Sequence, residues 1–439
     1  MMKPKKMENK AETKEMAKEP EEKFVIEGGK VLSGEIEVRG SKNSTAPILA
    51  ACLLTCEECL ISNLPLVRDV LNFLDILKEM GCEVEFVEGR KVRIKAKNVD
   101  PNKLNFEKFS MARTSVLLIG PLLARFNELR VSRPGGDRIG LRPITTHLEA
   151  FKKLAIEMVE SKGFYTFKRK KLKPAEIALP EFSVTATENL LLIASLIEGK
   201  TTIKLAAQEP HVFELINVLK KMGVKIEGQG THTLIVEGRS KLKGIKAEII
   251  PDYLEAGTFL ILGIATKSQI TIKNVIPWHL DSFFSKLKEL GACFEVKENS
   301  LTSLPSPNLK AIRVQALPFP GFPTDLLPLI VPLLTQADGK SLIHDPLYEN
   351  RLNYVNELRK MGADIEIVDP HRAFVLGKKP LKGVSIESWD IRAGASLVIA
   401  GLMAGGKTTL NHINQIDRGY EKLEERLQKI GANIKRASD

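Results

Sequence analysis

The amino-acid sequence predicts an α/β protein of two domains, each built from three similar units, with a cleft between the domains. The main observation is a phrase that recurs about every 70 residues, as in LKEMGCEV at Leu77 and LRKMGADI at Leu358. A second observation is that an apolar helical stretch and then a β-rich stretch precede the copies of this phrase. Six such units fill the 439 residues after a charged tail, and a chain of that length suffices for two ordinary domains.

The recurring phrase has the pattern of an amphipathic helix that ends at a glycine and leads into a strand. Its apolar residues recur at helical spacing, and a glycine just after a helix supplies the left-handed backbone conformation that ends it. The copy FKKLAIEM at Phe151 carries alanine in place of this glycine. The six marker positions are Gly81, Ala155, Gly223, Gly291, Gly362 and Gly431.

Each unit is predicted to run strand, helix, strand, helix and a closing strand pair. Three units open with a lead strand: LSGEIEV at Leu32, LKGIKAEI at Leu242 and LKGVSIES at Leu381. The first helices are apolar, as in GTFLILGIA and GASLVIAGLMA, so we expect them to be buried. A solenoid is the alternative, but solenoid units usually hold about 20 to 50 residues. Three subdomains that pack their apolar helices together would make one domain, and a cleft between two such domains favours a ligand site.

Composition limits the compartment and the partners. Residues 1–22 alternate lysine with glutamate and are predicted to be a disordered tail. No apolar run reaches the roughly 18 residues of a membrane helix, and sparse cysteines without an export signal favour the cytoplasm. The net charge of +11 indicates an anionic partner: nucleic acid, a membrane surface or a phosphorylated small molecule. Cys52, Cys56 and Cys59 have a spacing that suits an iron–sulfur cluster, but ordinary thiols are the preferred interpretation.

Residues suited to anion binding gather where the apolar helices are expected to begin. Helix N-termini attract anions because their N–H groups lack partners and carry partial positive charge. The segments at these starts are GSKNSTA, MARTS, SVTATEN, IPDYLEAGT, FPTDLL and WDIRAGAS, and the connectors add PGGDRIGLRP, QEPH, YENR and IDRGY.

These motifs, in order from Phe24 to Arg436, resemble those of the enolpyruvyl transferases. Asn43 in SKN favours the branch that acts on UDP-N-acetylglucosamine over the branch that acts on shikimate 3-phosphate, which typically has SKS. The resemblance implies two inside-out α/β barrel domains around a cleft, residues 42–250 and residues 23–41 with 251–439. It also implies transfer of the enolpyruvyl group of phosphoenolpyruvate to the 3-hydroxyl of UDP-N-acetylglucosamine, the first committed step of peptidoglycan synthesis. A cytoplasmic monomer that needs no cofactor or metal and binds neither nucleic acid nor membrane is expected.

The resemblance further implies a set of substrate contacts. Guanidinium groups bind carboxylate and phosphate in a planar, bidentate manner. Lys42, Arg142 and Arg418 would hold the phosphate, and Arg351 and Arg392 the carboxylate. The complete set for phosphoenolpyruvate is Lys42, Asn43, Arg142, Arg351, Arg392 and Arg418. The set for UDP-N-acetylglucosamine is Asn43, Arg113, Arg142, Pro143, Thr146, Ser183, Val184, Asp325 and Leu347, with Tyr348 beside them.

Enolpyruvyl transfer needs a base and an acid on different faces of the substrate, because a hydroxyl attacks the enol carbon while the methylene carbon gains a proton. By resemblance Asp325 is the base, with Lys42 and Arg392 as catalytic partners, although an aspartate before an apolar run is also a good helix cap. The acid is expected at Asp137, where most relatives have cysteine. Aspartate can donate a proton where desolvation raises its pKa. The alternative for Asp137 is a loop residue without chemistry.

Departures from the family pattern concentrate at the nucleotide end. They are Glu181 for lysine, Thr185 for glycine, Gln208 for arginine, His211 for glutamate and Tyr253 for arginine. A carboxylate near a diphosphate is unfavourable unless it turns away. Three alternatives stay open. One is another acceptor such as shikimate 3-phosphate, and a second is an enzyme like RNA-terminal phosphate cyclase, which would share the repeated α/β units and suit the basic charge. The third is an inactive paralogue, which Glu181 and Tyr253 favour.

Overall fold

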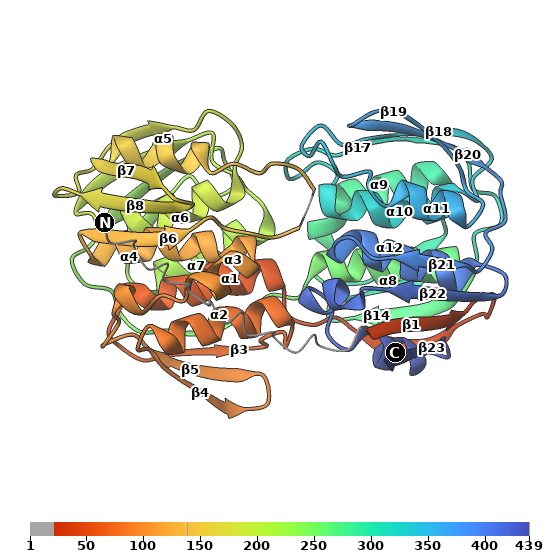
Figure 1. Ribbon diagram of the computed structural model, residues 1–439, viewed down its shortest axis with the longest axis horizontal. Helices are drawn as coiled ribbons and strands as arrows, with labels where there is room; N and C mark the ends of the chain where they lie inside the picture. Colours follow the sequence, from red (N-terminus) through yellow and green to blue (C-terminus); the bar gives the residue numbers. More distant parts are fainter. Residues whose placement is uncertain (1–21, 138, 439) are drawn as a thin grey trace, which may run out of the picture.

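The computed structural model describes residues 22–137 and 139–438, which form two lobes side by side (Figure 1). The predicted tail lies outside the described residues except for Glu22. That residue begins strand β1 (Glu22–Glu27), so the tail prediction is wrong at its last residue. Glu22 pairs with Ser438 at the other end of the chain, because β1 and β23 (Asn433–Ser438) are antiparallel neighbours.

Each lobe has a hydrophobic core of its own. The core of the first lobe draws on residues 46–249, and the core of the second lobe draws on residues 24–38 and 253–434. The predicted domain boundaries, after residues 41 and 250, fall between these stretches, and we propose them as the limits of the two domains. None of the helices in the described ranges has the length and apolar character that a membrane crossing requires.

The first lobe holds three units. The first consists of β13 (Lys246–Glu248), α1 (Lys42–Ala51), η1 (Cys52–Leu54), β3 (Cys59–Ser62), α2 (Arg68–Glu79), β4 (Glu83–Glu88) and β5 (Lys91–Lys95). The second consists of η2 (Pro101–Lys103), α3 (Phe106–Met111), η3 (Arg113–Leu118), α4 (Ile119–Arg125), β6 (Glu128–Ser132), α5 (Thr145–Lys153), β7 (Ile156–Ser161) and β8 (Phe164–Arg169). The third consists of β9 (Glu176–Ala178), α6 (Val184–Ala194), β10 (Gly199–Lys204), α7 (Pro210–Lys221), β11 (Lys225–Glu227) and β12 (Thr233–Gly238).

The second lobe repeats this plan. Its first unit consists of β2 (Ser33–Glu37), α8 (Tyr253–Ala265), β14 (Gln269–Lys273), η4 (Pro277–Leu280), α9 (Asp281–Leu290), β15 (Phe294–Val296) and β16 (Ser300–Ser303). The next consists of β17 (Arg313–Gln315), η5 (Thr324–Leu326), α10 (Leu327–Leu334), β18 (Gly339–His344), α11 (Val355–Lys360), β19 (Asp364–Asp369) and β20 (Arg372–Gly377). The last consists of β21 (Ser385–Glu387), α12 (Ile391–Met403), β22 (Lys407–Asn411), η6 (Ile413–Arg418), α13 (Leu423–Gln428), β23 and β1.

The apolar first helices lie inside each lobe and the sheets lie outside them. In the second lobe α8, α10 and α12 pack against one another at the centre (Figure 1), and every residue of α8 is buried. In the first lobe α6 packs against both α1 and α4. A helix that is apolar all round is stable only where it is covered on all sides, and three helices within a shell of sheets meet that requirement. The predicted inside-out arrangement is confirmed.

Two of the predicted lead strands belong to units other than those that follow them in sequence. Strand β2 runs parallel to β14, and β13 runs parallel to β3, so each lies in the other lobe from the helix that comes next along the chain. The two chain crossings lie together: Gly40 and Pro251 form an isolated bridge, and Ser41 N–H donates to the carbonyl of Ile250 at 2.8 Å. This pairing gives backbone polar groups at the two crossings hydrogen-bond partners, and it joins the lobes.

The second unit lacks a lead strand, which corrects the uniform plan predicted for all six units. Its sheet has three strands, in the order β6-β8-β7, whereas the other five sheets in the described chain have four. The segment before its first helix forms the turn η2 and the short helix α3 instead. Pro101 stands at the start of η2, and the side chain of Asp100 accepts the N–H of Asn102, so a turn forms where a strand would need a free backbone.

The marker positions adopt the predicted left-handed conformation. Gly81, Gly223 and Gly291 have φ of +96°, +105° and +83°. Ala155 follows them with φ of +60°, which is unfavourable for a residue with a Cβ. The copy at Phe151 therefore keeps the left-handed backbone of the repeat, although it lacks the glycine that suits this conformation.

Candidate active site

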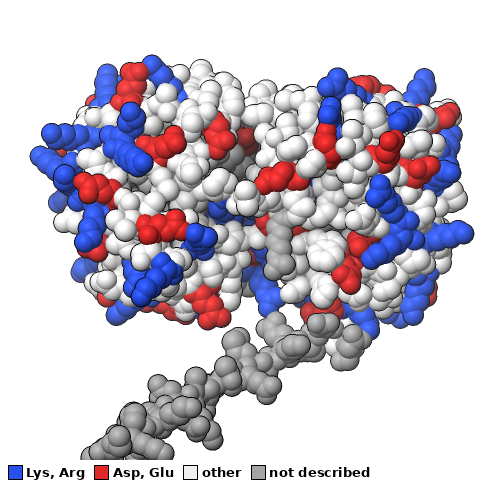
Figure 2. Space-filling model, turned by 45° about the horizontal axis from the view of Figure 1, so that its top comes forward, with Lys and Arg blue, Asp and Glu red and all other residues white. Residues whose placement is uncertain are grey.

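A cleft of about 590 Å³ lies between the lobes and takes its walls from both of them. Figure 2 shows the hollow where the two halves meet. Thr146 is buried behind the wall, where its hydroxyl donates to Glu181 Oε1 at 2.6 Å. The other predicted site residues line the cleft: Lys42, Asn43, Arg113, Asp137, Arg142, Pro143, Ser183, Val184, Asp325, Leu347, Arg351, Arg392 and Arg418.

One group of charges joins the two lobes. Lys42 begins α1 just after Ser41, whose hydroxyl accepts the Ser44 N–H and so caps the helix. The ammonium of Lys42 lies 2.6 Å from Asp69 Oδ2, and Arg418 Nε of the second lobe lies 3.0 Å from Asp69 Oδ1. Burial opposes ionisation of Asp69, but Lys42 and Arg418 outweigh it and hold the pKa of this carboxyl below its ordinary value.

Asp137 completes this group. Its Oδ1 accepts a hydrogen bond from Arg418 Nη1 at 2.6 Å, so the side chain faces the cleft and meets a cation from the opposite lobe. The glycine pair before it is required by close packing. A Cβ on Gly135 would lie 1.7 Å from the carbonyl oxygen of Ser110, and Gly136 has φ of +115°.

A second group of charges lies within the second lobe. Asp325 accepts from Arg351 through one carboxylate oxygen and from Arg392 Nε through the other, at 3.1 Å in the second case. Both guanidinium groups are buried, and Arg392 Nη1 donates to the hydroxyl of Tyr420 at 2.9 Å. Burial opposes ionisation of Asp325, but the charges of Arg392 and Arg351 outweigh it, so the pKa of Asp325 falls far below its ordinary value.

The alternative interpretation of Asp325 as a helix cap is wrong. Asp325 lies within the turn η5, and neither that turn nor the following α10 has a side-chain cap. Both carboxylate oxygens are instead engaged by arginines. Asp252 and Asp390 are the aspartates that cap neighbouring apolar helices, α8 and α12.

The Asp137 segment reaches across the cleft to the second lobe. The N–H of Leu141 donates to Glu349 Oε1 at 2.8 Å, and the N–H of Asn350 donates to the carbonyl of Ile139 at 3.1 Å. Arg142, with φ of +44°, places its guanidinium 5.7 Å from the centre of the Tyr348 ring. The structure therefore holds Asp137 over the cleft by contacts with the opposite lobe.

One part of the cleft wall, formed by Glu188, Glu209, His211 and Tyr253, is polar, but several of these buried groups favour the uncharged form. Burial, with the charge of Glu209 second, raises the pKa of Glu188 well above its usual value. Burial likewise raises the pKa of Glu209 and of Tyr253, and it lowers the pKa of His211 to about 4. One side-chain oxygen of Glu188 and Nδ1 of His211 are buried without a hydrogen-bond partner in the described chain. Glu188 and His211 both lie on the cleft wall.

Sequence reasoning missed three residues of the site. Asp69 bridges Lys42 and Arg418, but in the sequence it is only an acidic residue in the first turn of a helix. Tyr420 is the last residue of the IDRGY motif, so its position alone could have suggested it. Glu349 belongs to YENR, and its contact with Leu141 depends on how the lobes face each other, which a single sequence does not reveal.

Comparisons with known proteins agree in sequence and in fold. The family described as EPSP synthase (3-phosphoshikimate 1-carboxyvinyltransferase) matches residues 26–427. The chain is 44% identical to UDP-N-acetylglucosamine 1-carboxyvinyltransferase 1 of Carboxydothermus hydrogenoformans, over 95% of this chain and 99% of the relative. It is 41% identical to UDP-N-acetylglucosamine 1-carboxyvinyltransferase of Hydrogenovibrio crunogenus, over 95% of this chain and all of the relative.

Solved structures support the same assignment of fold. The enolpyruvyl transferase NikO from Streptomyces tendae superposes with a TM-score of 0.88 at 24% identity, covering 96% of this chain and all of that one. The EPSP synthase of Acinetobacter baumannii superposes with a TM-score of 0.71 at 18% identity, covering 95% of this chain and all of that one. With its two lobes of repeated units and its near full-length matches, the chain belongs to the EPSP synthase family of carboxyvinyl transferases.

Proposed function

We propose that this enzyme transfers the enolpyruvyl group of phosphoenolpyruvate to the 3-hydroxyl of UDP-N-acetylglucosamine and releases phosphate. The names of relatives at 41–44% identity support this acceptor over shikimate 3-phosphate and over a cyclase acting on RNA. The same names carry the wider proposal that the reaction serves peptidoglycan synthesis in the cytoplasm.

The observation that carries the proposal is the pair of cation groups on the cleft wall. Phosphoenolpyruvate has two anionic ends, a carboxylate and a phosphate. Arg351 and Arg392 already bind one carboxylate, that of Asp325, and their planar donors suit the carboxylate of the substrate. Lys42 and Arg418 face each other across Asp69 and would hold the phosphate. Arg142 lies on the wall of the same cleft.

The chemistry follows from where the two aspartates lie. Asp325 accepts the proton of the sugar 3-hydroxyl as its oxygen bonds to the central carbon of the enolpyruvyl group. Asp137, on the segment that crosses from the other lobe, takes up a proton when the substrate phosphate replaces it on Arg418. It then gives this proton to the methylene carbon, and a tetrahedral intermediate results. In the second stage the Asp137 carboxylate takes a proton back from the new methyl group as the bond between the central carbon and the phosphate oxygen breaks. The proton held by Asp325 passes to the departing phosphate. The products are the enolpyruvyl ether and inorganic phosphate.

The contacts of Asp325 suggest that phosphoenolpyruvate switches on the base. A carboxylate held by two arginines is a weak base, because both cations stabilise its ionised form. The substrate carboxylate would compete with Asp325 for Arg351 and Arg392. Asp325 then loses part of its stabilisation, its pKa rises, and it becomes able to accept the hydroxyl proton.

The proposed contacts of the acceptor sugar lie in the part of the cleft where this sequence departs from the family pattern. Glu181 is turned onto the Thr146 hydroxyl, which lessens its repulsion of a diphosphate. Gln208 accepts the N–H of Gly230 at 3.1 Å. We propose Asn43, Arg113, Ser183, Val184 and Leu347 as contacts of the nucleotide sugar on the basis of their place on the cleft wall.

Phosphate release from phosphoenolpyruvate tests the function, with each acceptor offered alone to the purified protein. Release with UDP-N-acetylglucosamine and not with shikimate 3-phosphate is expected. Release with shikimate 3-phosphate alone would transfer the assignment to the other branch. No release with either acceptor would contradict the proposal and favour an inactive paralogue.

A further inference from the structure

A polar network fixes the last unit of the second lobe against the first lobe, close to the cleft but outside its wall. At its centre is Glu421, which follows η6 and whose side chain is 8% exposed. One of its carboxylate oxygens accepts the N–H of Leu66 at 2.8 Å, and both are engaged by the guanidinium of Arg90. Arg90 also donates to the carbonyl of Leu64 at 3.2 Å. Leu64, Leu66 and Arg90 all belong to the first lobe, so this ion pair crosses between the lobes.

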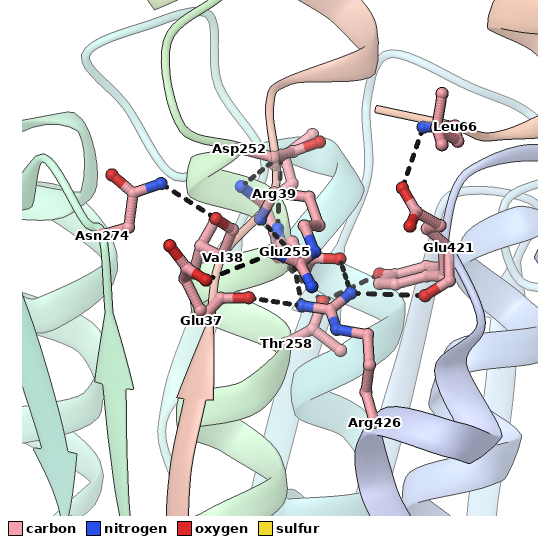
Figure 3. A network of polar contacts seen from close by, with 12 residues as sticks. Glu37, Val38, Arg39, Leu66, Asp252, Glu255, Thr258, Asn274, Glu421 and Arg426 are labelled. Carbon is pink, nitrogen blue, oxygen red and sulfur yellow. Dashed lines mark hydrogen bonds and ion pairs between the residues drawn. The ribbon is translucent and has the colours of Figure 1, made fainter. Parts of the chain in front are cut away.

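The same network is buttressed from within the second lobe. The guanidinium of Arg426, on α13, binds Glu255 at 2.5 and 3.0 Å and the carbonyl of Glu37 at 2.7 Å. Glu255 also accepts the N–H of Arg39 at 2.8 Å, at one of the two chain crossings. Figure 3 shows these residues together, with Glu421 reaching from its own lobe to Leu66. Arg426 Nη1 also donates to the backbone carbonyl of Glu421 at 3.5 Å, so contacts from both lobes hold the turn that carries Glu421.

This turn also carries Arg418, the second-lobe cation of the proposed phosphate site. Arg418 binds Asp69, and Glu421 binds Leu66. The two residues of each segment are three positions apart, so the second-lobe turn and the first-lobe segment are joined by two contacts. Residues 418–421 therefore contact the segment of residues 64–69 at two positions, Leu66 and Asp69. Only the first contact reaches the cleft.

We propose that Glu421 is a positioning residue for Arg418. It fixes the turn of residues 418–421 against the first lobe, so that the guanidinium of Arg418 stands beside Asp69 and Lys42 and the two lobes together form the anion site. Glu421 touches no reacting atom in this arrangement. The role rests on the proposed function, in which Arg418 and Lys42 hold the phosphate.

The chain offers a matched control three residues further on. Glu424 has a side chain 10% exposed and forms an ion pair with Arg436 Nε at 2.6 Å. That ion pair stays within the second lobe, because Arg436 lies on β23. Removal of either glutamate breaks an ion pair of similar burial on the same segment, but only Glu421 connects the lobes.

The test compares Glu421→Ala with Glu424→Ala in the full-length enzyme. Calorimetry gives the Kd for inorganic phosphate, steady-state assays give KM and kcat, and thermal unfolding gives Tm. Glu421→Ala should raise the Kd for phosphate and the KM for phosphoenolpyruvate about tenfold or more, since small misplacements of a binding group have large effects. The KM for UDP-N-acetylglucosamine should stay within about twofold, and Glu424→Ala should leave the phosphate Kd near its wild-type value.

A conservative variant separates positioning from folding. Glu421→Gln keeps an oxygen that can accept the Leu66 N–H and should recover most of the phosphate affinity, whereas Arg90→Ala should lose part of it. If Glu421→Ala does not fold, the phosphate Kd values of Glu421→Gln and Arg90→Ala test the proposal instead. Equal effects of the Glu421 and Glu424 variants, or affinity losses that merely follow Tm, would overturn the proposal. A wild-type protein that binds phosphate but turns over no acceptor would instead contradict the proposed function.

Discussion

Asp325 is the residue where charge and chemistry are most closely linked. Its carboxylate is partly exposed to the cleft and is held by Arg351 and Arg392, so Asp325→Asn replaces it with a group of similar shape that cannot accept a proton. We expect kcat to fall by about 10²- to 10⁴-fold, the range for loss of a general base. Steady-state assays with both substrates measure this fall. Asp364→Asn, at an exposed ion pair with Lys379, is the control and should keep wild-type turnover. A fall in kcat of less than tenfold would remove Asp325 from the role of base.

Asp137 makes a prediction about covalent inhibition. Epoxides that alkylate cysteine thiols should not label residue 137, since a carboxylate hydrogen-bonded to Arg418 stands there. Asp137→Cys should make the site reactive, because thiolates are the stronger nucleophiles. Peptide mass spectrometry after exposure to the epoxide distinguishes the two. Labelling of Asp137 in the wild-type protein would show that the carboxylate is more exposed and reactive than its contacts indicate.

His147 predicts how stability changes with pH. It is buried, and burial first and the charge of Arg113 second lower its pKa to about 3. In the unfolded chain a histidine has a pKa near 6.5, so below that pH the unfolded state binds a proton that the folded state does not. The contribution of His147 to the free energy of unfolding is therefore fully present above about pH 6.5 and is lost progressively as pH falls toward 3.

The measurement is urea unfolding of the wild type and His147→Gln at several pH values. The free energy of unfolding of the wild type, relative to the variant, should fall by about 1.4 kcal/mol for each pH unit below 6. Above pH 7 the difference should be constant. A difference that does not change between pH 7 and pH 5 would show that folded His147 takes up a proton over the same pH range as the unfolded chain.

At the scale of elements, the hydrophobic pattern predicted the buried helices better than it predicted the short lead strands and their pairing. The stretches GTFLILGIA and GASLVIAGLMA are apolar at every helical face, and they form α8 and α12 in the lobe centre. The lead strands β9 and β17 were not identified from the sequence, because Pro174 and Ala311 stand where the phrases of the other three lead strands have glycine. Of the three lead strands that it did indicate, β21 pairs with β22 of its own unit, whereas β2 and β13 lie in the opposite lobe from the helix that follows them. Such pairing depends on contacts far apart in sequence.

The marker positions give a prediction for the turn between helix and strand. Ala155 is exposed and has φ of +60°, so Ala155→Gly should stabilise the protein by about 1 kcal/mol through relief of the left-handed conformation. Gly223→Ala is the reverse change at φ of +105°, where an added Cβ meets nothing within 4 Å, and it should destabilise the protein. Urea unfolding measures both. Changes of the same sign in the two variants would show that packing, and not backbone conformation, decides stability at these turns.

At the scale of the whole molecule, the sequence indicated six units but could not show how the chain ends close the second lobe. Strand β1 lies between β22 and β23, and Phe24 and Ile26 on it are fully buried. The site depends on the same long-range arrangement, because Lys42 and Asp69 come from one lobe and Arg418 from the other. Motif resemblance found Lys42 and Arg418, but nothing local marked Asp69 as their shared partner.

This arrangement predicts which fragments of the chain fold. A fragment of residues 251–439 lacks the central strand β1 of one sheet and the edge strand β2 of another, and it leaves their apolar partners exposed. It should therefore unfold without cooperativity in urea. Glu22 and Ser438 are paired neighbours on antiparallel strands, so a short glycine-rich linker can join residue 438 to residue 22. The permuted fragment, residues 251–438 followed by the linker and residues 22–41, should show a single cooperative transition by circular dichroism. If residues 251–439 alone unfold as sharply as the permuted fragment, β1 and β2 are not needed for the second lobe, and the proposed domain limits would have to exclude residues 23–41.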